Sequence, residues 1–332
     1  MPKVELHLHL EGAIRPQTAL ELMQRNKAPH LPDEAEKVRD IYKFDNLGKF
    51  VAGMRAVSDN IRNLEDLQRI TVELLESLIR QNVRYVEFDC ALQKYIDLGF
   101  DLQDVIAAIY ESAFAFEKEY PIKSKLSVNL QRAHGPDSTL KLVEDISKIN
   151  HPYVVSIGLS GDETKYPQGL FADTFRRARE LGLHRTAHAG EGVGPESVWS
   201  AINDLQVERI DHGTRARDDE RLVEFIIERQ IPLTQCLTSN KKLQVIDELK
   251  NHPFGDFFRR GMMVTLNTDD PQVFGTELQR EFNLAATLFD LSRSDLAKIV
   301  LNAANASFLS YEDKKVLVDE LTAEFNILLQ EE

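Results

Sequence analysis

Two histidines lie two residues apart near the start of the chain, in the stretch HLHLEG at residues 7–12. Successive side chains of a β-strand point to opposite faces, so His7 and His9 would share one face and the neighbouring leucines the other. Neutral imidazoles suit zinc, and a catalytic zinc site keeps one coordination position open for water. The pattern therefore indicates either a polar surface strand or two ligands of one metal ion.

Ionisable residues also follow four later segments that have the composition of strands. These segments end in Ser160-Gly-Asp-Glu163, His188-Ala-Gly-Glu191, Asp211-His212-Gly213 and Asn267-Thr-Asp-Asp270. His188 and Asp269 could supply further metal ligands, Glu191 could donate a proton, and His212 could orient or deprotonate a water molecule. A bound metal would lower the pKa of that water from ~15.7 to about 7. Each residue alone is also typical of a turn, a helix cap or a core position, and their shared place at strand ends favours chemistry.

Short apolar segments alternate along the chain with longer segments of helical periodicity. Strands are predicted over Val4–Leu10, Val83–Phe88, Lys125–Leu130, Val154–Leu159, His184–His188, Arg209–Asp211, Pro232–Cys236 and Met263–Asn267. Helices are predicted between them, for example over Asn63–Gln81, with Asn63 as the N-cap, and over Asp219–Arg229. Strands that alternate with helices form parallel sheets, so the chain is predicted to fold as an α/β protein.

Eight such strands in one chain predict a (β/α)8 TIM-type barrel, in which active sites lie at the C-terminal ends of the strands. A doubly wound sheet is the alternative, but the glycines at 190, 192 and 194 lack the spacing of a dinucleotide-binding loop. No linker rich in proline, glycine or serine divides residues 1–332, so we expect a single domain. The segment 14–62 exceeds a simple crossover and is predicted to be a helical insertion between strands 1 and 2 that caps the barrel.

The composition limits the classes of partner. The formal net charge of −14 argues against a protein that binds nucleic-acid backbones, since these neutralise phosphates with clustered basic residues. Two cysteines, Cys90 and Cys236, are too few for a disulfide framework. The start of the chain lacks a signal peptide, and no apolar run approaches the ~20 residues of a membrane span. We expect a cytoplasmic protein without nucleic-acid or membrane partners, whose oligomeric state the sequence leaves open.

With these residues in view, the chain resembles the adenosine deaminase family of metallo-dependent amidohydrolase-type barrels, which includes adenosine and adenine deaminases. The resemblance rests on motifs in the family's order that extend over nearly the whole chain. They are PKVELHLHLEGAIRP, LSGDE, HRTAHAGEGVGPE, RIDHG, CLTSN, LNTDDP and NAANASFLSYEDKK.

The resemblance implies a zinc-dependent enzyme that deaminates a purine nucleoside. One zinc ion would be held by His7, His9, His188 and Asp269, and a zinc-activated water would attack C6 of the purine ring. Glu191 would protonate N1 of the ring. The base and electrostatic partner of the attacking water would be His212.

The resemblance also implies a set of substrate-binding residues. Asp270 would hydrogen-bond N7 of the purine, the backbone N–H of Gly161 would reach N3, and Glu11 would lie where the family meets the ribose. Leu47 and Phe50 match the region that forms an apolar lid. The implied reaction converts adenosine and 2′-deoxyadenosine to inosine, or deoxyinosine, and ammonia.

Three positions depart from the pattern of typical adenosine deaminases. Glu11 stands where these enzymes carry Asp, Asp211 where they carry Gly, and Gly158 where they carry Asp. The first two departures resemble adenine deaminases and deaminases of 5′-modified adenine nucleosides such as aminodeoxyfutalosine, so these substrates remain alternatives. Two further alternatives are a zinc hydrolase of ester, amide or phosphate bonds and an inactive relative that binds nucleosides.

Overall fold

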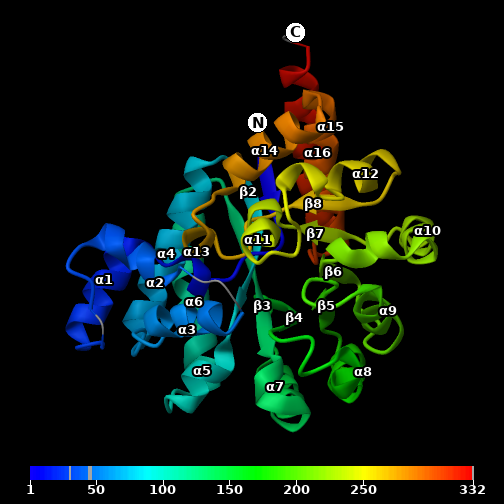
Figure 1. Ribbon diagram of the computed structural model, residues 1–332. Helices are drawn as coiled ribbons and strands as arrows, with labels where there is room; N and C mark the ends of the chain where they lie inside the picture. The colour runs from blue at the N-terminus through cyan, green and yellow to red at the C-terminus, as the bar shows by residue number, and fades with distance from the viewer. Residues whose placement is uncertain (30, 44–46, 331–332) are drawn as a thin grey trace.

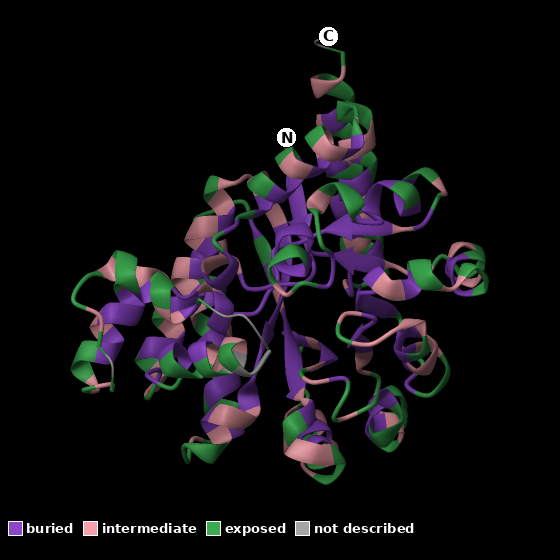
Figure 2. Ribbon diagram, in the orientation of Figure 1, coloured by how far each residue is buried: buried purple, intermediate pink, exposed green. Residues whose placement is uncertain are grey.

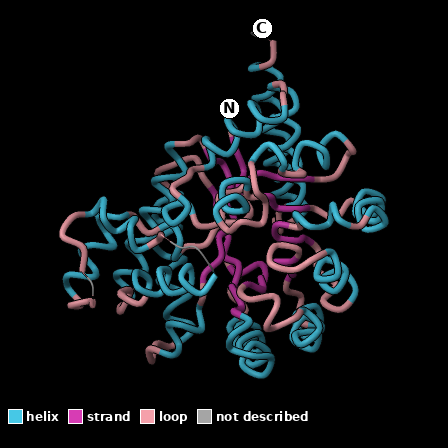
Figure 3. Tube along the Cα trace, in the orientation of Figure 1, coloured by secondary structure: helices cyan, strands magenta, loops and turns pink. Residues whose placement is uncertain are grey.

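The computed structural model describes residues 1–29, 31–43 and 47–330, and its centre is a barrel of eight parallel strands (Figures 1 and 3). The strands follow one another around the barrel in chain order, which is the arrangement of a (β/α)8 TIM barrel. They are β1 (Lys3–Glu5), β2 (Val83–Cys90), β3 (Lys123–Gln131), β4 (Val154–Ser160), β5 (His184–Ala189), β6 (Arg209–His212), β7 (Leu233–Gln235) and β8 (Val264–Leu266). The predicted fold is confirmed, and β2–β8 end within two residues of the predicted strands.

The first predicted strand, Val4–Leu10, is interrupted in the structure. The N–H of Leu6 donates to Oδ1 of Asn267, 2.9 Å away, instead of to a strand carbonyl, and β1 ends at Glu5. Backbone pairing resumes beyond this point: the N–H of His9 donates to the carbonyl of Asp269 at 2.8 Å. These bonds close the barrel between the segments that follow β1 and β8.

Helices surround the barrel and turn their exposed faces outward (Figure 2). Those between and after the strands are α4 (Leu64–Arg80), α5 (Leu92–Asp97), α6 (Leu102–Glu117), α7 (Gly135–Ile149), α8 (Ala172–Glu180), α9 (Pro195–Asn203), α10 (Glu220–Arg229), α11 (Leu237–Lys242), α12 (Phe254–Arg259), α13 (Pro271–Phe274), α14 (Leu278–Phe289), α15 (Arg293–Ala306) and α16 (Tyr311–Leu328). No helix among the described residues has the length and apolarity needed to cross a membrane.

Helix α4 forms for the reasons that its sequence indicates. The side chain of Asn63 accepts a hydrogen bond from the N–H of Asp66 at 2.8 Å, which caps the first turn. Leu67, Ile70, Leu74 and Leu78 recur at helical spacing and are all buried. The predicted helix over Asp219–Arg229 is likewise present as α10, capped by Asp219.

A helical insertion follows β1, as predicted. It contains α1 (Pro16–Arg25), α2 (Val38–Ile41) and α3 (Leu47–Ser58), together with the short 3-10 turns η1 (Glu11–Ala13) and η2 (Ala35–Lys37). Figure 1 shows these helices together on one side of the barrel.

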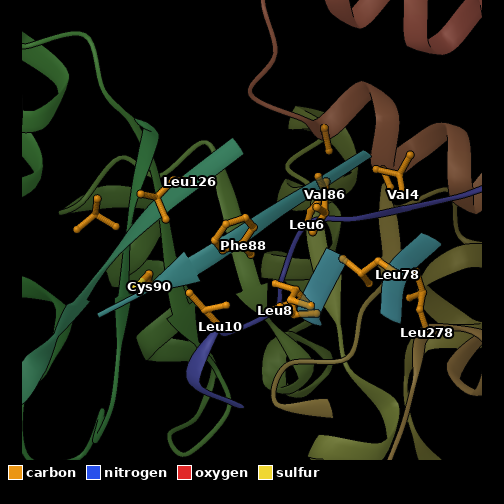
Figure 4. Packing of buried hydrophobic residues seen from close by; sticks show 14 of the residues in the cluster. Val4, Leu6, Leu8, Leu10, Leu78, Val86, Phe88, Cys90, Leu126 and Leu278 are labelled. Atoms are coloured by element: carbon orange, nitrogen blue, oxygen red, sulfur yellow. The ribbon is translucent and has the colours of Figure 1, made fainter. Parts of the chain in front are cut away.

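Leucine and histidine alternate around His7 and His9, and this places the leucines on one side of the segment and the histidines on the other. Leu6, Leu8 and Leu10 are buried in the apolar layer outside the barrel wall, in the same cluster as Leu78 and Val86 (Figure 4). The two histidines therefore point to the barrel interior, because alternate side chains of an extended segment face opposite ways.

Candidate active site

Four of the predicted residues meet inside the barrel, beyond the C-terminal ends of the strands. Nε2 of His188 lies 3.1 Å from Nε2 of His7 and 3.3 Å from Nε2 of His9. Oδ1 of Asp269 lies 3.4 Å from Nε2 of His7 and 3.2 Å from Nε2 of His9. All four residues are buried.

These atoms have the spacing of metal ligands. A tetrahedral zinc ion bound at about 2.0–2.1 Å separates its ligands by roughly 3.3 Å. Two imidazole lone pairs that face each other across 3.1 Å repel unless a cation lies between them. His212 could join His7, His188 and Asp269 in such a group. However, Nε2 of His212 lies 3.9 Å from Oδ2 of Asp269, whereas Nε2 of His9 lies 3.2 Å from Oδ1 of the same carboxylate. The buried group of histidines and Asp269 therefore fits one metal ion.

The charges around the imidazoles favour a cation. Burial lowers the pKa of His7 and His9, but Asp211, Asp269 and Asp270 outweigh it and raise both values to about 10. Burial raises the pKa of Asp269, and hydrogen bonds from the two imidazoles more than offset this, so its pKa lies well below the usual range. A metal ion would supply the positive charge that these carboxylates stabilise.

The backbone is strained where β6 and β8 end. His212 and Asp269 both have a φ of +64°, a left-handed conformation that residues with a side chain seldom adopt. Such strain persists only where surrounding contacts maintain it, and it is concentrated at functional sites. Here it points one imidazole and one carboxylate toward the same cluster.

Glu191 and His212 lie together beside the metal-binding cluster, with Oε1 of Glu191 3.3 Å from Nε2 of His212. Burial and the nearby carboxylates of Asp269 and Glu163 raise the pKa of Glu191 well above its usual value. Burial also lowers the pKa of His212 to about 3. Burial therefore favours the protonated carboxyl group of Glu191 and the neutral imidazole of His212.

A buried carboxylate holds the loop that carries Glu191. Glu163 accepts hydrogen bonds from the N–H groups of Gly190, Glu191 and Gly192 at 3.1, 3.2 and 3.0 Å, and from the hydroxyl of Ser197. Four donors on one carboxylate fix the path of this loop. Glu163 is a residue to which the sequence alone assigned no role. Its place in the LSGDE motif, at the end of a strand, is the signal that could have identified it.

A chain of hydrogen bonds ends at Nδ1 of His212 and holds its ring in place. The N–H of Phe254 donates to Nδ1 of His252 at 3.1 Å, so a neutral His252 carries its proton on Nε2. That Nε2 donates to Oδ1 of Asn240 at 3.0 Å, and Nδ2 of Asn240 donates to Nδ1 of His212 at 3.1 Å. His252 is buried, and its partner Asn240 lies 12 residues away in sequence.

Asp270 and Glu11 stand next to the cluster. Asp270 is buried, and its Oδ1 has no hydrogen-bond partner within the described part of the chain. Burial together with Asp269 raises the pKa of Asp270 to about 7. Only a glycine fits at position 12, since a Cβ there would come 1.9 Å from Oδ1 of Asp270. Glu11 is buried, and its Oε1 accepts from the N–H of Ala91 at 3.1 Å, at the end of β2.

The remaining predicted residues lie at the same end of the barrel or on the insertion. Gly161 directly follows β4 and has a φ of +103°, which a glycine adopts without strain. The ring of Phe50 on α3 stacks on Phe274 of α13, with centroids 5.6 Å apart. Leu47 begins α3, but its side chain lies outside the described part of the structure.

Comparison with known proteins gives one consistent family. Residues 2–324 match the family model described as adenosine deaminase. The chain is 35% identical over 324 residues to an aminodeoxyfutalosine deaminase of Streptomyces avermitilis, covering 97% of this chain and 90% of that protein. It is 31% identical over 332 residues to an adenosine deaminase of Clostridium kluyveri, covering 99% and 95% of the two chains.

Two solved structures are also similar to this chain over nearly its whole length. An adenine deaminase from Arthrobacter aurescens has a TM-score of 0.92 and 30% identity, covering 98% of this chain and 99% of that one. An amidohydrolase from Burkholderia ambifaria with bound zinc has a TM-score of 0.92 and 28% identity, covering 99% and 92%. The two solved structures thus share the fold of this chain, and the relatives that are named as deaminases differ in the compound that they are named for.

Proposed function

The chain belongs to the adenosine deaminase family, and on that premise we propose that it hydrolyses adenosine and 2′-deoxyadenosine to inosine or deoxyinosine and ammonia. The observation that carries this proposal is the pairing of Glu191 with the cluster of imidazoles and Asp269. A carboxyl group with a strongly raised pKa beside a metal-binding group has the chemistry needed to add water to a ring nitrogen–carbon bond.

We propose that one zinc ion is held by His7, His9, His188 and Asp269. Three imidazoles and one carboxylate are ligands that zinc accepts, and the similar amidohydrolase of Burkholderia ambifaria has bound zinc. When bound, the ion supplies the Lewis acidity that makes water a nucleophile near neutral pH.

Glu191 serves as the proton donor to N1 of the purine. Addition of water to C6 breaks the aromaticity of the ring and moves electrons onto N1. A donor at N1 stabilises that charge as it develops, which lowers the barrier more than it strengthens substrate binding. Glu191 can donate only while protonated, and its raised pKa favours the protonated form.

His212 serves to orient the attacking water, and the proton that the water loses passes to Glu191 once Glu191 has protonated N1. Nδ1 of His212 accepts from Asn240, so the neutral ring carries its proton on Nε2, the nitrogen that faces Glu191. A ring in this tautomer donates a hydrogen bond to an oxygen atom and has no lone pair there with which to take a proton.

Asp270, Gly161 and Glu11 bind the substrate. Purine N7 is an acceptor, and the unpartnered Oδ1 of Asp270, whose pKa is about 7, can donate to it in the protonated form. The N–H of Gly161 would reach N3, and Glu11 would bind the ribose. Phe50 and Leu47 of α3 would cover the bound nucleoside, so that residues 14–62 act as a cap on one domain of residues 1–332.

A 5′-modified adenine nucleoside is a second candidate substrate, which Glu11 specifically favours. The carboxylate of Glu11 is anchored on the N–H of Ala91 and lies beside the buried ammonium group of Lys94. A longer acid held at the end of β2 can form a pocket that extends past the ribose. The 35% identity to an aminodeoxyfutalosine deaminase agrees with this alternative.

Two further features fit a small-molecule enzyme of the cytoplasm. Cys90 and Cys236 are both buried and unpaired, as in proteins of reducing compartments. The net charge of −14 disfavours nucleic acid as a partner.

The test is turnover by the zinc-loaded protein of adenosine, 2′-deoxyadenosine, adenine and a 5′-substituted adenosine, followed by ammonia release and ultraviolet absorbance. We expect turnover of the first two with adenine inert. Exclusive turnover of adenine or of the 5′-substituted compound would assign the pocket to that substrate. A zinc-loaded protein that turns over none of them would contradict deamination and favour a hydrolase of ester, amide or phosphate bonds.

A further inference from the structure

Asp211 is a buried carboxylate that no step of the proposed reaction uses. It lies on β6 beneath the imidazoles and is 2% exposed. The hydroxyl of Thr186 on β5 donates to its Oδ2 at 2.7 Å, and the hydroxyl of Thr234 on β7 donates to its Oδ1 at 2.9 Å. Donors on the two neighbouring strands therefore hold both oxygens in place.

Two imidazoles turn their second ring nitrogen toward this carboxylate. Nδ1 of His188 lies 3.6 Å from Oδ2 of Asp211, and it is a buried nitrogen without a hydrogen-bond partner among the described residues. Nδ1 of His7 lies 3.9 Å from Oδ1. On the opposite side of both rings the Nε2 atoms converge, 3.1 Å apart.

The hydroxyl of Thr234 links His7 to Asp211. Its Oγ1 lies 3.0 Å from Nδ1 of His7 and donates its own proton to Asp211. Because the single proton of this hydroxyl is directed at Asp211, the hydroxyl can only accept from His7, whose Nδ1 therefore carries a proton. The ring then presents the lone pair of Nε2 to the metal-binding cluster.

We propose that Asp211 is a positioning residue for two metal-binding histidines: it sets the tautomer of His7 through Thr234, and its carboxylate, 3.6 Å from Nδ1 of His188, favours a proton on that nitrogen. An imidazole that donates its second N–H to a carboxylate is fixed in orientation and is a stronger ligand. This inference rests on the metal-dependent function proposed above, and it explains why a charged residue occupies position 211 inside the barrel.

The test is the affinity of the full-length protein for zinc, measured by competition with a chromophoric chelator. We expect Asp211→Asn to weaken binding by about 10- to 100-fold, as removal of such partners does. The control is Asp89→Asn, which removes another buried carboxylate of the barrel interior, on β2, and should weaken binding less. Substitution of cobalt for zinc adds a second measurement, since its visible spectrum should change in Asp211→Asn.

Thr234 provides a pair of variants that remains informative if Asp211→Asn does not fold. Thr234→Val removes the hydroxyl and should lower zinc affinity, and Thr234→Ser, which keeps it, should restore the affinity. Wild-type affinity in Asp211→Asn, or equal affinities in the two Thr234 variants, would overturn the proposal. A wild-type protein that binds zinc tightly but deaminates no adenine compound would contradict the proposed function but not the role of Asp211. The zinc affinities of the Asp211 and Thr234 variants would still decide that role.

Discussion

Glu191 and His212 show how neighbouring residues acquire opposite chemical roles from their surroundings. Their side chains approach to 3.3 Å, and burial acts on both. Burial disfavours the charged form of either group, so it raises the pKa of the acid and lowers that of the imidazole. Separated values of this kind are the usual basis for dividing donor and acceptor roles in an active site.

The substitution Glu191→Gln tests the donor role. The amide keeps the shape of the side chain but cannot transfer a proton, and we expect kcat to fall by about 10²- to 10⁴-fold. Metal content and thermal unfolding should stay close to wild type. Steady-state kinetics and metal analysis measure both, with Glu196→Gln, an exposed glutamate at the start of α9, as the control. Activity retained in Glu191→Gln would remove this residue from the mechanism.

The buried His252 makes stability depend on pH. Burial and Arg217 lower its pKa from 6.5 to about 3 in the folded protein. Between these values the unfolded chain binds more protons, so the free energy of unfolding falls as pH decreases. From pH 7 to pH 5 this group alone should cost about 2 kcal/mol. Urea unfolding at several pH values should show a flatter profile in His252→Gln, and an unchanged profile would contradict the assignment. His134→Gln, at a half-buried position, is the control.

At the scale of elements, the insertion after β1 and the segment after β8 meet beside the site. The stacked rings of Phe50 and Phe274 join α3 to α13, and α13 begins directly after Asp270. Helix α3 is therefore placed relative to the residues that would contact the purine. If α3 caps the site as we propose, it would exclude water and orient the substrate.

The substitution Phe50→Ala should weaken this placement. Aromatic pairs contribute about 0.5–1.5 kcal/mol beyond the area that they bury, so we expect KM to rise by roughly three- to tenfold. The kcat and the metal content should change little. Arg55→Ala, at an exposed position of the same helix, should leave KM unchanged. Equal KM values in the two variants would argue against α3 as the cap.

At the scale of the whole molecule, a buried ion pair ties the barrel to the C-terminal part of the chain. Nη1 of Arg209 on β6 lies 2.7 Å from Oε2 of Glu87 on β2, and both side chains are at most 1% exposed. Arg209 also donates to the carbonyl of Ala306, and Glu87 accepts from the N–H of Phe308. The bond between Glu87 and Phe308 joins residues 221 positions apart in sequence.

Removal of one charge from this pair should destabilise the fold strongly. Glu87→Gln leaves the guanidinium of Arg209 buried without its partner, which costs about 3–5 kcal/mol of unfolding free energy. The control is Glu324→Gln, because the pair of Arg84 and Glu324 is about one-third exposed and should contribute less than about 1 kcal/mol. Denaturant unfolding of both variants measures the difference, and similar losses would contradict the role of burial.

The amino-acid sequence by itself determined which segments become strands and helices and which residues stand at the strand ends. Alternating and helical periodicities are local properties, so they predicted the barrel, the N-cap at Asn63 and a shared face for His7 and His9. The grouping of His188, Asp269, Glu191 and His212 then followed from the topology, because the C-terminal ends of parallel strands meet at one end of a barrel.

Only the tertiary structure decided the contacts that join distant parts of the chain. The break after Glu5 depends on the side chain of Asn267, and the burial of His252 depends on Asn240. The partners of Asp211 come from two strands, and Glu163 reaches the loop of Glu191 across 28 positions. Such contacts form when the barrel closes and brings separate strands within hydrogen-bond distance. Local sequence periodicity does not predict which residues of distant strands will become neighbours.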